Sequence, residues 1–279
     1  MPGTLFLCAT PIGNLKDMTP RVVETLGNVD LIAAEDTRNS IKLLNHFDIH
    51  TPMTSYHEYN KVEKARQLLE QLLGGKDIAL ITDAGTPAIS DPGEVLVRMC
   101  HESGVNVTSL PGAAACITAL TMSGLSTRRF CFEGFLPADK KEKAQVMSEL
   151  KNESRTIVIY EAPHHLLRTL KELYEAVGDR KITLCRELTK KFETVTPTTL
   201  SNALAYYETN EPKGEYVLVL EGKSIDEKRR EEIALWENMS INEHMAYYES
   251  QGLDSKAAMK QVAKDRGVGK REIYAYLNN

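Results

Sequence analysis

The residues best suited to chemistry lie in three loops of small side chains, each of which directly follows an apolar segment. The loops are ATPIGNLKDMTP, which begins at Ala9, then TDAGTPAISDPG over Thr82–Gly93, and SLPGAAACITAL over Ser109–Leu120. Glycine and alanine let main-chain atoms approach a ligand closely, and ligands of open α/β sheets bind beyond the carboxyl ends of strands. The loops therefore predict a ligand cleft along one sheet edge, with room beside the alanines of the third loop for an adenosine.

Two common ligand motifs do not fit these loops. The first loop is neither G-x-G-x-x-G nor a phosphate-binding P-loop, since no Gly-Lys-Ser/Thr follows it. Asp83 and Asp91 carry oxygen atoms of the kind that bind metals, but no histidine or further acid lies at a recurring ligand spacing. The alanines of the third loop could also serve only to pack a helix closely on a sheet. The sequence thus predicts a site without a metal ion.

Two polar segments, AEDTR and SYHEYN, are expected near the ends of other strands. Arg38 could hold a phosphate through two parallel hydrogen bonds. Asp36, His57 or Glu58 could act as a base toward a hydroxyl group. The alternative is that each of these side chains forms only a surface ion pair or a helix cap.

Three segments of the second half also abut expected strands. They are YEAPHHL over Tyr160–Leu166, CREL over Cys185–Leu188 and KGEYVLVLEG over Lys213–Gly222. Junctions between domains are common ligand sites. These segments are therefore expected to form the second wall of a cleft between the two halves of the chain.

The elements that must position these residues follow an α/β pattern, in which short apolar runs alternate with helical periodicity. The strands expected in the first half are Thr4–Ala9, Leu31–Ala34, Ile78–Thr82 and Val105–Ser109. The helices expected between and after them are Arg21–Leu26, Thr37–Phe47, Lys61–Leu73, Gly93–Ser103 and Gly112–Ser123. A first α/β domain is therefore expected over residues 1–120.

A second α/β domain is expected over residues 121–223. Its expected strands are Phe130–Glu133, the central strand Thr156–Tyr160, Ile182–Arg186, the edge strand Phe192–Pro197 and Tyr216–Leu220. Its expected helices are Lys140–Leu150, His164–Ala176 and Thr199–Glu208. A charged stretch, KSIDEKRREE, follows and is interpreted as a linker or a solvated helix.

The remaining residues, within 224–279, differ from the rest of the chain. Three short helices separated by glycine turns are expected over Asn242–Gln251, Ser255–Arg266 and Lys270–Leu277, a pattern like a helix-turn-helix. Six basic and two acidic residues over Asp254–Arg271 give this segment a local charge of +4. The spacing of Lys256, Lys260 and Lys264 places them on one helix face. Such a face is either simply solvated or part of a nucleic-acid contact.

Composition limits the class of protein. Hydrophobic residues make up 42% of the 279 and charged residues 26%, which is typical of a soluble globular protein and excludes wholesale disorder. No apolar run approaches the ~20 residues that cross a bilayer, so no membrane segment is expected. Five scattered cysteines without a C-x-x-C pair indicate reduced thiols in a cytoplasm. The net charge of −5 restricts any nucleic-acid contact to a local patch.

Taken in chain order, these segments resemble the tetrapyrrole methylase superfamily, whose members use S-adenosylmethionine as methyl donor. The order is ATPIGNLKDMTPR, AEDTR, SYHEYN, ITDAGTPAISDPG, LPGAAACITAL, GFLP, IVIYEAPHHL, CRELTKKFE and KGEYVLVLEG, which covers nearly the whole chain. Members that methylate corrinoid precursors carry G-x-G-P-G-D after the first strand and Gly-Asp-Pro in the second loop. This chain has ATPIGN and Gly-Thr-Pro there, which favours the branch that 2′-O-methylates a cytidine of 16S rRNA.

The resemblance implies two α/β domains of the tetrapyrrole methylase type with the methyl donor in the cleft between them, a small C-terminal helical segment, and a homodimer. The donor-contact positions that it carries over are Pro11, Thr86, Ile89, Ala115, Cys116, Tyr160 and Leu188. For the transfer itself we expect Asp36 or His57 as base and Arg38 on an RNA phosphate. The RNA contacts expected in the C-terminal helices are Lys256, Lys260, Lys264, Lys270 and Arg271.

Two other functions remain open at this point. One is a methyltransferase that acts on a small tetrapyrrole-like substrate, which would not need the basic tail. The other is a non-catalytic RNA-binding protein that uses the same fold as a platform. Binding of S-adenosylmethionine distinguishes the second of these from an enzyme.

Overall fold

The fold is described from a computed structural model that covers residues 1–224, 226–227, 236 and 238–278. These residues form two compact units, Met1–Gly222 and Lys223–Asn279, which are described separately. The described residues of the first unit contain two five-stranded sheets, and those of the second unit include the three helices named below. In the described part of the chain, no helix is long and apolar enough to pass through a bilayer.

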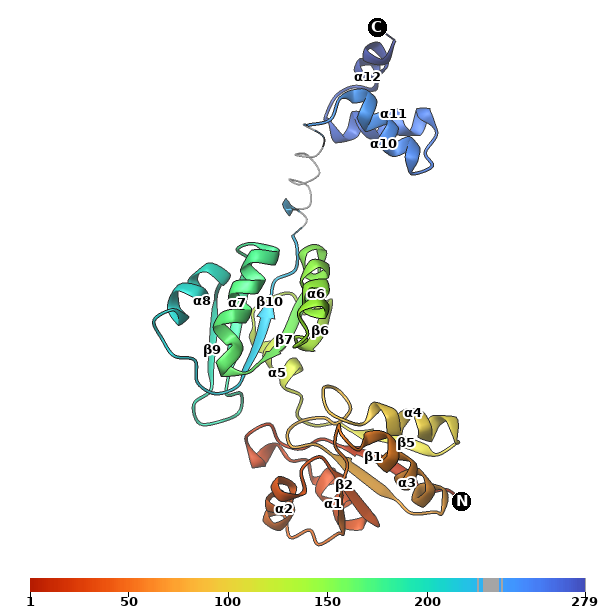
Figure 1. Cartoon of the computed structure of the whole chain (residues 1–279), viewed down its shortest axis with the longest axis vertical. Coiled ribbons are helices and arrows are strands. Elements are labelled where there is room, and N and C mark those ends of the chain that lie inside the picture. The colour runs from red at the N-terminus through yellow and green to blue at the C-terminus, as the bar shows by residue number, and fades with distance from the viewer. Residues whose placement is uncertain (225, 228–235, 237, 279) are drawn as a thin grey trace. The chain divides into compact units, whose positions relative to one another are not determined.

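The first sheet is entirely parallel, with the strand order β3-β2-β4-β1-β5. Its strands β1, β2 and β5 are labelled in Figure 1. Its strands are β1 (Thr4–Cys8), β2 (Leu31–Ala34), β3 (Met53–Ser55), β4 (Ile78–Ile81) and β5 (Asn106–Leu110). The carboxyl ends of parallel strands meet at one edge. Because β4, β1 and β5 are neighbours, the three small-residue loops that follow them emerge side by side.

Helices cover both faces of this sheet, as a parallel sheet requires. Those of the first half are α1 (Pro20–Asn28), α2 (Thr37–His46), α3 (Lys61–Leu73) and α4 (Glu94–Glu102), with a short 3₁₀ turn, η1 (Leu15–Asp17). Apolar side chains of α1 and α2 pack on one face, and those of α3 and α4 pack on the other. All four residues of β4 are buried, since both of its faces are covered.

The second sheet is mixed, with the order β6-β7-β10-β8-β9. Its strands are β6 (Phe130–Phe135), β7 (Thr156–Glu161), β8 (Lys181–Arg186), β9 (Thr194–Thr199) and β10 (Tyr216–Leu220). One face is covered by α6 (Lys140–Asn152), α7 (Pro163–Val177) and α8 (Leu200–Tyr207). The other face packs on α5 (Ala115–Met122), the helix that follows the third small-residue loop.

Most expected elements are confirmed, within a few residues at their ends. β7 is an interior strand beside the middle strand β10, and β9 is an edge strand, where Pro197 needs no ladder hydrogen bond. The sequence missed β3, which has only three half-buried residues and no alternating pattern. The helix expected from Gly112 begins at Ala115, because Pro111 and Gly112 continue the loop.

The second unit consists of α10 (Ile241–Ser250), α11 (Ser255–Asp265) and α12 (Lys270–Leu277), close to the three helices expected there. Ser240 and Glu243 form a reciprocal capping box at the start of α10, and Asp254 caps α11. Residues 225 and 228–232 of the expected linker KSIDEKRREE lie outside the described residues. The helices share a small apolar core of their own.

A buried polar network joins α10 to α11. The ring of His244 stacks on that of Trp236 with 3.9 Å between centroids, and its Nδ1 accepts a hydrogen bond of 3.2 Å from Arg266 Nε. Arg266 also donates to the carbonyls of Trp236 and Met239. His244 Nε2 faces Asp265 at 3.4 Å. Burial and the nearby Arg266 guanidinium hold the pKa of His244 below its ordinary value.

We expect acid to destabilise this unit. The unfolded chain takes up the His244 proton near the ordinary pKa of 6.5, and the folded unit does so only at lower pH. Each pH unit below 6.5, down to the folded pKa, therefore costs up to about 1.4 kcal/mol. Trp236 is the single tryptophan of the chain, so its fluorescence reports melting of this unit. His244→Phe keeps a ring against Trp236 but cannot titrate; an equal acid sensitivity in that variant would contradict the assignment.

Candidate active site

The three small-residue loops are held together by hydrogen bonds between them. Thr10 and Gly85 exchange two backbone bonds, of 2.9 and 3.1 Å, which join the loops after β1 and β4. The hydroxyl of Thr86 donates to the carbonyl of Ala113 at 2.9 Å, which joins the loops after β4 and β5. The loops therefore form one continuous floor, in agreement with the cleft edge expected from the sequence.

Two glycines let these loops approach so closely. A Cβ on Gly112 would lie 2.6 Å from the Cβ of Ala9, so no other residue fits there without displacing the first loop. Gly85 has a φ of +90°, and a Cβ there would lie 3.3 Å from the side chain of Ile12. Residues with a Cβ atom disfavour such positive φ values, whereas glycine adopts them readily.

The second sheet supplies the opposite wall. The hydroxyl of Tyr160, near the end of β7, accepts a hydrogen bond of 3.1 Å from the backbone N–H of Cys116, in the first turn of α5. The rings of Phe132 and Phe135 pack edge-on against Tyr160 at 4.9 and 5.6 Å between centroids. The β8–β9 loop contributes Leu188, which is buried. This wall is largely apolar and is tied directly to the third loop.

Strained backbone lies next to this wall and floor. Of the four described non-glycine residues with positive φ, three flank cavity residues: Ala88 at +65°, Glu187 at +50° and Thr189 at +63°. Such conformations cost on the order of 1–3 kcal/mol each and cluster at ligand sites. Ala88 precedes Ile89, and the other two flank Leu188, so the surrounding structure holds the backbone in a costly conformation next to two cavity-lining side chains.

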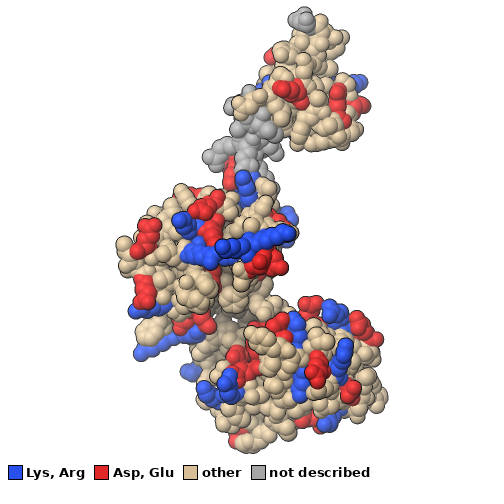
Figure 2. Space-filling model, in the orientation of Figure 1, with Lys and Arg blue, Asp and Glu red and all other residues tan. Residues whose placement is uncertain are grey.

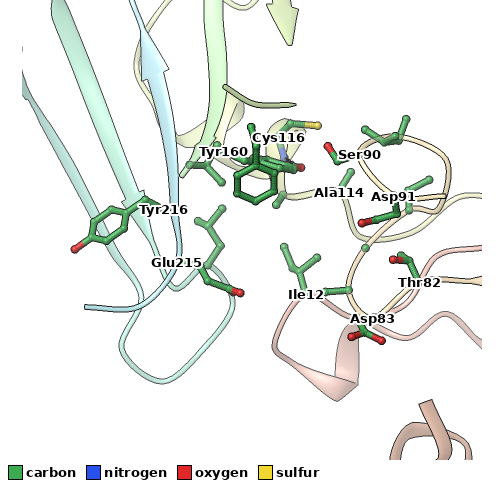
Figure 3. A pocket seen from close by; sticks show the side chains of 18 of the residues that line it. Ile12, Thr82, Asp83, Ser90, Asp91, Ala114, Cys116, Tyr160, Glu215 and Tyr216 are labelled. Carbon is green, nitrogen blue, oxygen red and sulfur yellow. Dashed lines mark hydrogen bonds between the residues drawn. The ribbon is translucent and has the colours of Figure 1, made fainter. Parts of the chain in front are cut away.

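Between floor and wall lies a cavity of about 320 Å³, which is within the range of small-molecule sites (Figure 3). Six of the seven donor-contact positions expected from the resemblance line it: Thr86, Ile89, Ala115, Cys116, Tyr160 and Leu188. Pro11 does not line it; its neighbour Ile12 does. The structure thus brings these six residues, from four separate segments, to one cavity, and their role toward a donor stays a prediction.

The expected catalytic residues lie outside the lining of this cavity. Asp36 caps α2, and its carboxylate pairs with Arg38 at 2.7 Å, the ion pair and cap that the sequence had left open as an alternative. The hydrogen bonds from Arg38 lower the pKa of Asp36 to about 2, which makes it a weak base. His57 Nε2 lies 3.3 Å from Asn60 Nδ2, within its own turn. Their catalytic assignment remains untested.

A different group of carboxylates reaches the cavity. Glu35 follows β2, while Asp83 and Asp91 belong to the loop after β4. Burial, opposed by a hydrogen bond from Thr82, raises the pKa of Asp91 to about 6. Among the described residues, no three His, Cys, Asp or Glu side chains are placed to hold a metal ion. From the sequence, Asp83 and Asp91 were considered only as metal ligands. Their position directly after β4, the middle strand of the first sheet, was the signal that could have indicated a catalytic role.

The cavity lining is acidic. Its carboxylates are Glu35, Asp83, Asp91, Glu161, Glu187 and Glu215, and its one lysine is Lys190. Lys190 already pairs with Glu187 at 3.0 Å and with Glu215 at 2.8 Å. The cavity is therefore suited electrostatically to a ligand with positive charge. On the face shown in Figure 2, acidic and basic side chains are interspersed over the first unit, so that face offers no broad basic surface.

The basic residues expected to contact RNA are exposed in the second unit. Lys256, Lys260 and Lys264 lie on α11, and Lys270 and Arg271 begin α12. In the described part of the chain, these five side chains form no ion pair with an acid, so their charge is directed to solvent. The sixth basic residue of the segment, Arg266, serves the His244 network instead.

Comparison with known proteins agrees with this architecture. The model of the family Tetrapyrrole (Corrin/Porphyrin) Methylases matches residues 4–204. A solved structure of diphthine synthase has a TM-score of 0.64 at 14% identity, and the match covers 80% of this chain and 91% of that one, which shows the shared fold.

Two curated relatives match nearly the full length. The protein named ribosomal RNA small subunit methyltransferase I is 48% identical in Halalkalibacterium halodurans and 47% identical in Bacillus subtilis. Each match covers 98% of this chain and 93% of the relative. The chain therefore belongs to the tetrapyrrole methylase family and, within it, to the ribosomal RNA small subunit methyltransferase I family.

Proposed function

We propose that this chain transfers a methyl group from S-adenosylmethionine to the ribose 2′-hydroxyl of a cytidine in 16S rRNA of the small ribosomal subunit. The observation that carries the proposal is the acidic cavity that loops of both sheets enclose. The family relationship supports the reaction class, since the relatives are named as methyltransferases of small-subunit rRNA.

The residues present fit such a donor. Ile12, Ile89 and Leu188 offer apolar surface for an adenine, and the alanines before and at the start of α5 leave room for it. The carboxylates of the lining complement the positive sulfonium. When bound, the donor supplies a methyl group on an activated leaving group, so the chain needs no metal ion for the transfer.

The chain's own task is positioning. The ribose oxygen must lie about 3 Å from the methyl carbon and in line with the bond that breaks. Hydrogen bonds between the loops hold the floor together, and the Tyr160–Cys116 hydrogen bond joins the opposite wall to it. The exposed rim residues Phe135 and Ile89 offer apolar surface against which a nucleoside would exclude water.

The second unit supplies RNA affinity in this proposal. Its five exposed basic side chains would contact phosphates, which position the RNA but do not read its sequence. Arg38, whose guanidinium is largely exposed beside Asp36, is proposed as a further phosphate contact on the first unit.

Replacing those five residues by glutamine tests this role. Lys256, Lys260, Lys264, Lys270 and Arg271 are changed together in the full-length chain. The logarithm of rRNA affinity falls with the logarithm of salt by about 0.7 for each phosphate contact to single-stranded RNA, so the slope should decrease by about 3.5. Affinity is measured by filter binding from 50 to 300 mM salt (roughly the range in which phosphate contacts are resolved). An unchanged slope would contradict the contact.

The proposed reaction is tested directly with purified protein, small ribosomal subunits and a donor labelled in its methyl group. The label should appear on one cytidine, where a 2′-O-methyl group blocks alkaline cleavage. Label on a tetrapyrrole-like substrate but not on rRNA would favour a small-molecule methyltransferase. No calorimetric heat with S-adenosylmethionine at millimolar concentration would favour a non-catalytic RNA-binding protein.

A homodimer in the cytoplasm completes the proposal. The five cysteines are all free thiols, in agreement with a reducing compartment. Light scattering after size exclusion measures the mass, and a value of one 31.2 kDa chain would contradict the dimer.

A further inference from the structure

A carboxylate of the second small-residue loop is placed to take part in proton transfer. Asp91 lies near the end of that loop, lines the cavity and is partly buried. In Figure 3 its side chain lies beside Thr82 and is directed toward the cavity. None of the loop-joining bonds described above uses this carboxylate, so a structural role in the floor does not account for it.

Two polar side chains that also line the cavity, Thr82 and Glu35, are linked to Asp91. Thr82 is buried, and its hydroxyl donates to Glu35 Oε2 at 2.5 Å while also lying within hydrogen-bonding reach of the Asp91 carboxylate. A hydroxyl has a single proton and two lone pairs. When Asp91 carries a proton, Thr82 can accept from it while still donating to Glu35. The contact with Thr82 lowers the pKa of Asp91, so on balance it favours the ionised carboxylate.

We propose that Asp91 is the general base for the transfer, and that Thr82 and Glu35 are positioning residues that act through it. This inference rests on the proposed ribose methylation. Asp91 takes the role of base that the sequence analysis expected of Asp36 or His57, because Asp91 lines the cavity and those two side chains do not.

The transfer forms one bond, breaks one bond and moves one proton. The 2′-oxygen forms a bond to the methyl carbon, and the carbon–sulfur bond breaks with its electron pair left on a neutral sulfide. The hydroxyl proton passes to the Asp91 carboxylate and leaves to solvent after product release. No oxidant, reductant or metal ion enters this balance.

The surroundings of Asp91 suit this role. A base works best when its pKa lies near the working pH, and burial together with Glu35 and Asp83 raises the pKa of Asp91 to about 6. The other titratable group that faces it is the Tyr160 hydroxyl, whose own pKa is raised by burial. An ordinary exposed aspartate would be a far weaker base at neutral pH.

The first test compares Asp91→Asn and Asp91→Glu with the control Asp48→Asn, which makes the same change at an exposed site outside the cavity. Single-turnover methylation of small subunits is measured from pH 5 to 8.5. We expect Asp91→Asn to slow transfer at least about 100-fold, and Asp91→Glu to retain part of the rate. Calorimetry should show donor affinity weakened by no more than about tenfold, about 1.4 kcal/mol, because five of the six lining carboxylates remain.

The pH dependence of thermal melting tests the environment of Asp91 without donor or RNA. Folded Asp91 binds a proton up to about pH 6, whereas its ordinary pKa is 3.8, so stability falls as pH rises through this window. Asp91→Asn removes that fall. The melting temperature of the variant, relative to that of the unchanged protein, should therefore rise between pH 4 and 7. Equal pH dependence of melting in the two proteins would contradict the assigned environment.

Thr82→Val and Thr82→Ser test the positioning role. Loss of the hydroxyl removes a bond that favours ionised Asp91, so the valine variant should shift the midpoint of the pH–rate profile upward, and serine should restore it. A purely structural role would lower the rate without moving the midpoint.

The outcomes separate this inference from the proposed function. A threefold or smaller loss of rate in Asp91→Asn, or a loss of donor binding equal to its loss of rate, would overturn the base while rRNA methylation stands. If the unchanged protein places no label on rRNA at any pH, the proposed function itself fails.

Discussion

Replacing Thr86 by arginine is expected to abolish donor binding. Thr86 lines the floor of the cavity, and its hydroxyl bonds to the loop that leads into α5. An arginine there places a long side chain inside a cavity of about 320 Å³ and removes the bond that joins two of the loops. We expect the dissociation constant for S-adenosylmethionine to rise by at least about 100-fold, about 2.8 kcal/mol.

Both the bulk and the charge of the arginine weaken donor binding in the Thr86→Arg variant. The guanidinium brings a permanent positive charge into a site whose carboxylates complement a sulfonium, and like charges at close range repel. The carboxylates that attract the donor would instead pair with the new arginine. Raising the salt concentration should therefore restore little affinity, because the side chain still fills the cavity.

Thr209→Arg is the matched control for this change. Thr209 is exposed after α8, its hydroxyl also bonds to a backbone carbonyl, and it does not line the cavity. Calorimetry with the donor should separate the two variants while thermal melting shows both folded. Donor affinity in Thr86→Arg equal to that of the control would place the donor elsewhere.

Removing residues 224–279 is expected to leave donor binding intact and to suppress methylation of the ribosomal subunit. The first unit, Met1–Gly222, is compact by itself and contains every residue that lines the cavity. Lys223 is buried and stays in the shortened chain. The five exposed basic residues of α11 and α12 are lost, and affinity for rRNA should fall on the order of 100-fold at physiological salt.

The variant with all five basic residues replaced by glutamine shows how much of this loss is due to charge. If phosphate contacts account for the loss, both proteins should show the same decrease in salt slope. A larger loss in the shortened chain would mean that shape contacts of the helices add to the charges. Full rRNA methylation without residues 224–279 would show that the second unit has no part in the reaction.

The sequence alone was sufficient for the local structure around the site. Gly85, Gly112 and the alanines before α5 mark loops where backbones approach closely, and apolar runs before them mark the strands. A helix such as α3 was predicted over its full extent, Lys61–Leu73, because its apolar spacing and the glycines after it are both local signals. The resemblance of the motifs then indicated the family.

Only the tertiary structure decided which polar side chains share the cavity. Asp36 and Glu35 are adjacent in sequence, yet Asp36 caps α2 while Glu35 accepts a hydrogen bond from Thr82, at the end of the neighbouring strand β4. In the sequence, Arg266 is one of six basic residues of the C-terminal segment, but in the structure it donates a hydrogen bond to His244. The physical reason is that helix and strand patterns depend on neighbours along the chain, whereas the direction and pKa of a side chain depend on burial and on partners dozens of residues away.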